Sequence, residues 1–340
     1  MRFTAPLGII LGLLGLAHGG FGQKVVVYSS VDQIFSERVF HVYERKTGIQ
    51  VTGVFDTEET KSTGIVNRLI AEQRRPRADV FFSGDPLRAM VLKKKGVLTP
   101  YASPMSQGLP TLYRDEDHAF TGFSARARII LVNTDLVTEP DAISGLADFL
   151  DPKWSQKTAI ANPLFGTTSY HLAALFVAWG DEKAKRFLDG IRANGCRVVS
   201  SNGEVRRLVS KGEVAFGLTD TDDARVAELE GSPVRTILPD QTTAGEWGGL
   251  GALLIPSCAC LIAGGPNPEE GRRFIDFLLS PEVEELLARL ECAQMPLRHG
   301  VPIPEGMIGS DQMKTLNVDL DETADRLEAI LPWLEQWSTP

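Results

Sequence analysis

The chain has 340 residues, a formal net charge of −9 and a hydrophobic content of 43%. This length suits two domains of ordinary size, each able to bury its own core. The acidic balance excludes a protein that binds nucleic acid, because such recognition needs a basic surface.

Residues 1–22 have the pattern of an export signal. Arg2 is their only charged residue, and an apolar run at 7–16 follows it. A run of about 10 apolar residues is too short to span a bilayer, which needs about 20. Small residues precede a predicted cleavage site before Gln23, and no Cys stands there to carry a lipid. We therefore predict a cleaved signal peptide and an unanchored protein of the periplasm.

Beyond this signal, segments with the pattern of strands alternate with segments of helical periodicity. The predicted strands are 25–30, 49–55, 78–84, 123–134, 196–201 and 213–220, with a strand pair at 251–265. The predicted helices lie at 35–43, 62–72, 168–179, 203–210, 269–290 and 323–337, with two others ending at Lys95 and beginning at Lys183. Such alternation predicts parallel pairing and an open α/β sheet. The order of elements is typical of two α/β lobes with a cleft between them. In such sheets, ligands bind at the carboxyl ends of strands and the amino ends of helices.

The cysteines are Cys196, Cys258, Cys260 and Cys292. An even number in an exported protein permits disulfides. Cys258 and Cys260 alternate along a predicted strand, so they face the same way and cannot easily pair with each other. Free thiols and a disulfide both stay open, and the favoured pairing joins Cys292 to Cys258 or Cys260. The histidines are too scattered for a zinc site with these cysteines.

Several segments resemble the periplasmic solute-binding proteins of ABC importers, in the group that includes the ferric-iron-binding proteins. In chain order they are VVVYSSVD (25–32), ADVFFSGDP (78–86), KGVLTPY (95–101), SARAR (124–128) and FIDFLLSPE (274–282). The resemblance covers nearly the whole chain beyond the signal. It implies a two-lobe α/β fold of the type II periplasmic-binding-protein class, with crossover strands between the lobes and no enzymatic activity.

The same resemblance implies the domain boundaries and the partners. Lobe 1 is expected to comprise 23–125 and 252–340, and lobe 2 to comprise 126–251. A monomer would trap its ligand in the cleft by hinge closure and deliver it to an ABC permease in the cytoplasmic membrane.

The residues that match the metal ligands of ferric-binding members differ in this chain. The position after the first strand, a His or similar ligand in those members, is Asp32. The position of a Glu at the second helix falls near Thr63, and a pair of tyrosines is replaced by Asp222 and Asp223. Phenolate is a strong ligand for Fe(III). A bound Fe(III) or divalent metal, with carbonate or phosphate, would instead be held by Asp32, Asp222 and Asp223. These aspartates, with Asp220, equally suit the solvated start of a helix.

The junction at 162–171 predicts an anion site. Thr167, Thr168 and Ser169 place hydroxyls beside the unpaired N–H groups of a helix start, which attract anions. The alternative is that they are ordinary helix caps. Asn202 matches an anion contact of ferric-binding relatives, or it is a plain turn residue.

Arg126 and Arg128 alternate in a strand and therefore share a face. The resemblance to the periplasmic solute-binding proteins implies that the first of these arginines can contact the bound anion. A guanidinium group suits carboxylate or phosphonate oxygens. The alternative is a buried ion pair with an acid of the opposite lobe. Ser30 and Ser83 end two strands, where their hydroxyls could bind a small ligand.

Four further residues are lesser candidates for the predicted cleft. Glu58 and Glu59 follow the second predicted strand, where an acidic loop is more often merely solvated. Trp247 either walls the cleft or packs in the core. Tyr28, in the first strand, either ligates or faces the core.

Two ligand classes stay open within the binding-protein interpretation. Family resemblance favours a metal ion, iron with a synergistic anion. The rival is a zwitterion such as an aminoalkylphosphonate, with its phosphonate on the 167–169 hydroxyls and Arg126 and its ammonium on Asp222 and Asp223. A secreted metal-dependent enzyme, suggested by Asp220 and Asp222 in a D-x-D pattern, lacks any recognised nucleophile or metalloprotease motif. A secreted interaction module is the third class.

Overall fold

The computed structural model describes residues 23–56, 63–242 and 245–339. The predicted signal peptide, and with it the predicted cleavage, lies outside these residues, as do Glu58 and Glu59. Within the described ranges, none of the helices combines the length and apolar character that crossing a membrane requires.

Lobe 1 is built on a parallel sheet, as the strand–helix alternation predicted. Its strands pair in the order β2-β1-β3. These are β1 (Lys24–Ser29), β2 (Gln50–Phe55) and β3 (Val80–Ser83), followed in turn by α1 (Gln33–Thr47), α2 (Thr63–Ala71) and α3 (Pro86–Lys94). The helix ends follow local chemistry. Gly48 takes a left-handed φ of 72° after α1, and Asp85 caps α3 by accepting a hydrogen bond from the Arg88 N–H at 2.8 Å.

Lobe 2 repeats this plan with its own parallel strands. β6 pairs in parallel with both β7 and β8. The parallel strands are β6 (Thr158–Ala161), β7 (Arg197–Val199) and β8 (Phe216–Asp220), whereas β9 (Val234–Ile237) pairs antiparallel with another strand. The helices are α4 (Gly166–Trp179), α5 (Asp181–Ala193), α6 (Asn202–Ser210) and α7 (Thr221–Leu229).

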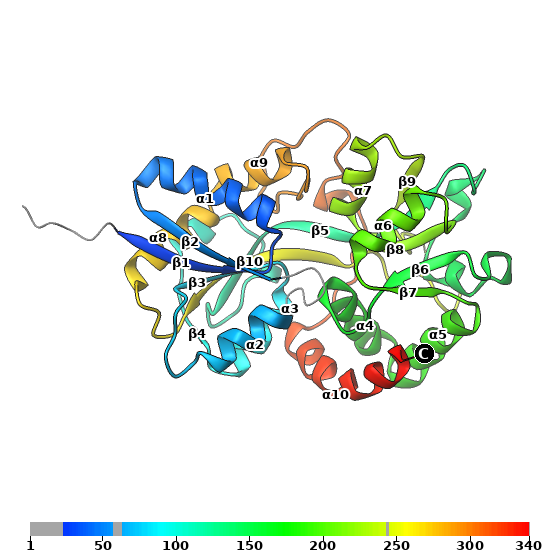
Figure 1. The fold of residues 1–340 in the computed structure, drawn as a ribbon, viewed down its shortest axis with the longest axis horizontal. Coiled ribbons are helices and arrows are strands. Elements are labelled where there is room, and N and C mark those ends of the chain that lie inside the picture. The colour runs from blue at the N-terminus through cyan, green and yellow to red at the C-terminus, as the bar shows by residue number, and fades with distance from the viewer. Residues whose placement is uncertain (1–22, 57–62, 243–244, 340) are drawn as a thin grey trace, which may run out of the picture.

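Two long buried strands, β5 (Phe120–Asn133) and β10 (Leu254–Ile262), join the lobes (Figure 1). The first half of β5 pairs with β10, which in turn pairs with β3 of lobe 1. The second half of β5, from Arg128 onward, pairs with β8 and β9 of lobe 2. These are the crossover strands that the resemblance implied. The expected strand pair at 251–265 is wrong, because the run is apolar through burial on both faces of one strand rather than through a hairpin.

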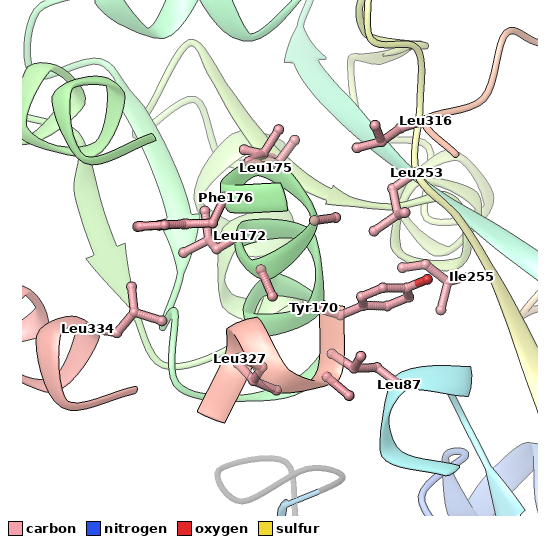
Figure 2. Packing of buried hydrophobic residues seen from close by; sticks show 14 of the residues in the cluster. Leu87, Tyr170, Leu172, Leu175, Phe176, Leu253, Ile255, Leu316, Leu327 and Leu334 are labelled. Carbon is pink, nitrogen blue, oxygen red and sulfur yellow. The ribbon is translucent and has the colours of Figure 1, made fainter. Parts of the chain in front are cut away.

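The C-terminal helices take two different positions. α8 (Pro268–Leu278) packs on the sheet of lobe 1 beside α1, and α9 (Pro281–Arg289) follows it. α10 (Leu320–Ser338) instead lies against α4 of lobe 2 and α3 of lobe 1 (Figure 1). In Figure 2, Leu327 and Leu334 of α10 lie near Leu172 and Phe176 of α4, with Leu87 of α3 close by. The last helix therefore contacts both lobes.

The described cysteines are free thiols, so the favoured disulfide is not formed. Cys258 and Cys260 belong to the apolar cluster on one face of the sheet, together with Tyr28 and Phe81. Cys292 belongs to the cluster on the other face. The sheet separates the thiols, and strand alternation, which placed Cys258 and Cys260 on one face, could not tell on which face Cys292 packs.

Candidate functional site

A cleft of about 360 Å³ is lined by both lobes. Lobe 2 contributes the starts of α4, α6 and α7, which follow β6, β7 and β8. Lobe 1 contributes Asp32, Ile34 and Phe35 at the start of α1, and the crossover strand β5 contributes Arg126. The cleft thus lies where parallel strands end and helices begin, the place at which such sheets bind ligands.

The structure brings most of the predicted site residues to this one cleft. Those that line it are Asp32, Arg126, Thr167, Thr168, Asn202, Asp222 and Asp223. They come from both lobes and from the crossover strand, so residues as far apart in sequence as Asp32 and Asp223 share one surface.

The start of α4 offers backbone donors to the cleft. Gly166 adopts a φ of 56°, which favours glycine, and Phe165 at the N-cap position supplies no side-chain hydrogen bond to the first turn. α6 differs, because the Ser201 hydroxyl accepts from the Glu204 N–H at 3.1 Å. The uncapped N–H groups and positive dipole end of α4 therefore suit an oxyanion.

Asp220 is the centre of a buried polar network. Its carboxylate accepts from Arg128 Nη1 at 2.7 Å and from the Thr167 hydroxyl at 2.8 Å, and it lies 3.3 Å from Arg126 Nε. Asn202 Nδ2 donates to Thr167 Oγ1 at 2.8 Å and extends the network. Burial alone would raise the pKa of Asp220, but the two guanidinium groups and the hydrogen bonds hold it below its usual range.

The arginines are thus engaged in a buried ion pair, as the alternative held, but the acid is not on the opposite lobe: Asp220 lies in the range 126–251 that also contains both arginines. Arg128 is fully buried, and Arg126 also donates to the carbonyl of Gly84, in lobe 1, at 2.9 Å. Because Asp220 already neutralises these cations, its oxygens are poorly placed to bind a metal. The alternation of residues along the strand predicted that both arginines share a face, but it did not indicate which aspartate would pair with them.

Asp222 and Asp223 form an acidic cluster beside this network. Asp222 accepts from the Asp223 N–H at 3.0 Å and lies 3.8 Å from Arg126 Nε, and Asp223 accepts from the Thr219 hydroxyl at 2.7 Å. One carboxylate oxygen each of Asp220, Asp222 and Asp223 lies within 4.8 Å of the others. No comparable group of three His, Cys, Asp or Glu ligands occurs elsewhere in the described ranges.

The charge of this cluster is incompletely compensated. Burial, opposed by the charge of Arg126 and aided by those of Asp223, Asp220 and Asp32, raises the pKa of Asp222 to about 8. A carboxyl with such a pKa holds a proton at neutral pH, and a positive centre in the cleft would replace that proton.

The predicted serines lie outside the lining of the cleft. The Ser30 hydroxyl accepts from the Gly84 N–H at 2.9 Å, and the Ser83 hydroxyl donates to the Asp85 carbonyl at 2.7 Å. The Ser169 hydroxyl accepts from Arg88 Nη2 at 2.8 Å. All three are buried, and their hydrogen bonds shape the turns that border the cleft.

Trp247 and Tyr28, each predicted either to face the cleft or to pack in the core, are both packed against other side chains. Trp247 packs edge-on against Trp179, with a centroid distance of 5.6 Å, and tilts against Phe187. Tyr28 is 1% exposed, and its hydroxyl donates to Glu72 at 2.8 Å. Neither side chain lines the cleft.

Sequence reasoning missed several lining residues, among them Ile34, Phe165 and Arg206. Arg206 carried a readable signal, since it follows Asn202 by four residues on one helix and so shares its face. Ile34 is 62% exposed in α1, and it lay just outside the helix predicted at 35–43, so no corresponding signal marked it.

Comparison with known proteins agrees with this architecture. Residues 24–289 match the family model of the bacterial extracellular solute-binding proteins. Iron uptake protein A1 of Synechocystis is 26% identical over 91% of this chain and 85% of its own length. A putative 2-aminoethylphosphonate-binding periplasmic protein of Salmonella typhimurium is 24% identical over 96% of this chain and 92% of its own. The ferric binding protein of Campylobacter jejuni superposes with a TM-score of 0.80 at 20% identity, covering 92% and 99% of the two chains, which confirms the predicted fold.

Proposed function

Because the chain belongs to the family of bacterial extracellular solute-binding proteins, we propose that it is the ligand-capturing component of an ABC importer. Its ligand would combine a positive centre with an oxyanion and would be held between the lobes. The proposed function is binding without catalysis, since the family binds solutes and does not transform them.

The proposal depends on the presence of an acidic cluster and an anion-favouring helix start in the same cleft. Asp222 and Asp223 lie on the side formed by α7, and Asp32 joins them from lobe 1. The uncapped start of α4, with Thr167 and Thr168, lies in the same cleft and favours negative charge. A ligand that is positive at one end and negative at the other satisfies both parts.

A metal ion, iron foremost, with a synergistic oxyanion is the first candidate. Iron-binding proteins are prominent among the relatives, and the carboxylates of Asp32, Asp222 and Asp223 are hard oxygen donors of the kind that suits such ions. The oxyanion, carbonate or phosphate, would complete the coordination from the α4 side.

An aminoalkylphosphonate is the second candidate. The lining includes no Tyr, His or Cys among the described residues, and Asp220 is already occupied by arginines. A cavity of about 360 Å³ is within the range of small-molecule pockets, roughly 300–1,000 Å³. The phosphonate would accept from the α4 start, and the ammonium would pair with Asp222 and Asp223.

Capture follows from the two half-sites. A ligand held by Asp32 of lobe 1 and by α4 and α7 of lobe 2 binds the closed arrangement of the lobes better than the open one, and so shifts the population toward closure. A permease would then recognise the closed, loaded form.

The test is a thermal-shift titration of the metal-stripped mature protein. The probes are Fe(III) with and without carbonate or phosphate, divalent metals, and 2-aminoethylphosphonate. A probe at about 100 times its dissociation constant should stabilise the protein by roughly 2.7 kcal/mol. A response to Fe(III) with an oxyanion supports the first candidate, and a response to the phosphonate alone supports the second. No response to any probe would contradict both.

Variants separate the two halves of the site. Asp222→Asn should abolish the response to metal, whereas Thr168→Ala should weaken phosphonate binding more. Asp189→Asn, at an exposed position of α5 outside the cleft, is the matched control and should respond like the unaltered chain.

A further inference from the structure

Arg206 is a guanidinium of the cleft that the predicted anion site did not include. It lies on α6, four residues after Asn202, and both residues line the cleft. The other side of α6 is fixed in the core by Val205 and Val209, which are fully buried. The helix is therefore held in one rotation, and the Asn202–Arg206 face is turned toward the ligand cavity.

The charges around the cleft distinguish Arg206 from the other arginines. Arg126 and Arg128 contact the buried Asp220, at 3.3 and 2.7 Å. The ion pair that the structure gives Arg206 is with Glu230, at 3.6 Å between Nη1 and Oε1. That distance is longer than a hydrogen bond, and the Glu230 side chain is 58% exposed, so water competes for the pair.

The Arg206–Glu230 contact is also more exposed to solvent than the ion pair of Arg128. The side chain of Arg206 is 25% exposed, compared with 0% for that of Arg128. A partly exposed guanidinium with a loose, solvated partner can change rotamer at small cost, whereas Arg128 is locked by Asp220, Thr167 and Asn202.

We propose that Arg206 is the specificity-determining residue for the oxyanion of the ligand, turning from Glu230 to a tetrahedral oxyanion, a phosphate or phosphonate, held at the start of α4. The planar guanidinium donates two parallel N–H groups to two oxygens of such a group. Glu230 serves as the counter-ion of Arg206 while the cleft is empty. This inference rests on the proposed function and adds the residue that selects the anion.

The experiment compares binding isotherms of the full mature chain and its variants by calorimetry. The oxyanion probes are 2-aminoethylphosphonate and Fe(III) with inorganic phosphate, and Fe(III) without an oxyanion tests the cation half alone. The variants are Arg206→Gln, Arg206→Lys and Glu230→Gln. Arg235→Gln is the matched control, because Arg235 is an exposed arginine of β9 whose partner Asp141 lies outside the cleft.

We expect Arg206→Gln to weaken binding of the oxyanion probe by about 10-fold to 100-fold, the effect of losing charge-assisted hydrogen bonds. Binding of Fe(III) without an oxyanion, and the melting temperature of the empty protein, should not change. Arg206→Lys should retain only part of the affinity, since an ammonium cannot form the two parallel bonds. Glu230→Gln should bind at least as tightly as the unaltered chain.

The outcomes separate this inference from the proposed function. Unchanged oxyanion binding by Arg206→Gln, in a chain that binds the probe, overturns the role of Arg206 and leaves the proposed function standing. Equal weakening for probes with and without an oxyanion also overturns it, because that pattern marks a structural role. If the unaltered chain binds none of the probes, the proposed function and this inference fall together.

Discussion

Replacing Asp222 by Asn should stabilise the empty protein while abolishing capture of a positive centre. Burial and the neighbouring carboxylates raise the pKa of Asp222 to about 8, compared with about 3.9 for an Asp in an unfolded chain. Between these two values the folded protein binds a proton that the unfolded chain has released. The contribution of Asp222 to stability therefore falls as the pH rises from about 4 to 8.

The magnitude follows from the difference in pKa. Between about pH 4 and pH 6, Asp222 is ionised in the unfolded chain but protonated in the folded protein. Over these roughly two pH units the free energy of unfolding falls by about 3 kcal/mol. An amide in the same position carries no charge, so Asp222→Asn removes this cost. Binding sites often carry such local destabilisation in the absence of ligand.

The assay is urea unfolding of the metal-stripped protein at pH 4, 6 and 8, for the unaltered chain, Asp222→Asn and the control Asp189→Asn. The free energy of unfolding of Asp222→Asn should exceed that of the unaltered chain by an amount that grows with pH, and the control should show no such divergence. A variant that is less stable at pH 6, or whose difference does not change with pH, would refute the electrostatic reasoning.

Three further predictions concern groups around the cleft and the last helix. Asp220→Asn should cost about 3–5 kcal/mol in urea unfolding, because Arg128 would stay buried without its counter-charge; a loss below about 1 kcal/mol would contradict the buried pair. Burial, with the charge of Arg128, lowers the pKa of His171 to about 3, so its contribution to stability should decline as the pH falls below about 6.5. His171→Gln should therefore flatten the dependence of the free energy of unfolding on pH between about pH 6.5 and 4. An unchanged slope would refute this role of His171. Leu334→Ala should cost about 2–5 kcal/mol and expose α10 to proteolysis, whereas Glu335→Ala, at an exposed position, should do neither; equal effects of the two would contradict the packing of α10 on the lobes.

The amino-acid sequence by itself determined the alternation of strands and helices and therefore the two α/β lobes. Periodicity is local, so most of the parallel strands and the positions of α4 and α6 could be predicted without knowing how they pack. The start of α7 entered only as one of two alternatives for Asp220, Asp222 and Asp223. The cleft residues at helix starts followed, because helix starts after parallel strands meet at one edge of a sheet. Thr167 was predicted in this way, whereas Asn202 and Asp222 were identified through the resemblance to the ferric-iron-binding proteins.

Tertiary structure alone decided how these residues are used. Asp220 and Asp222 are two residues apart, yet the pKa of Asp220 is lowered by two buried arginines and that of Asp222 is raised by burial and neighbouring carboxylates, because the two side chains have different surroundings. The thiols of Cys258 and Cys292 pack on opposite faces of the sheet, and α10 lies across both lobes, for the same reason. Pairing, burial and charge compensation depend on contacts between residues far apart in sequence, and no local pattern encodes which of these contacts form.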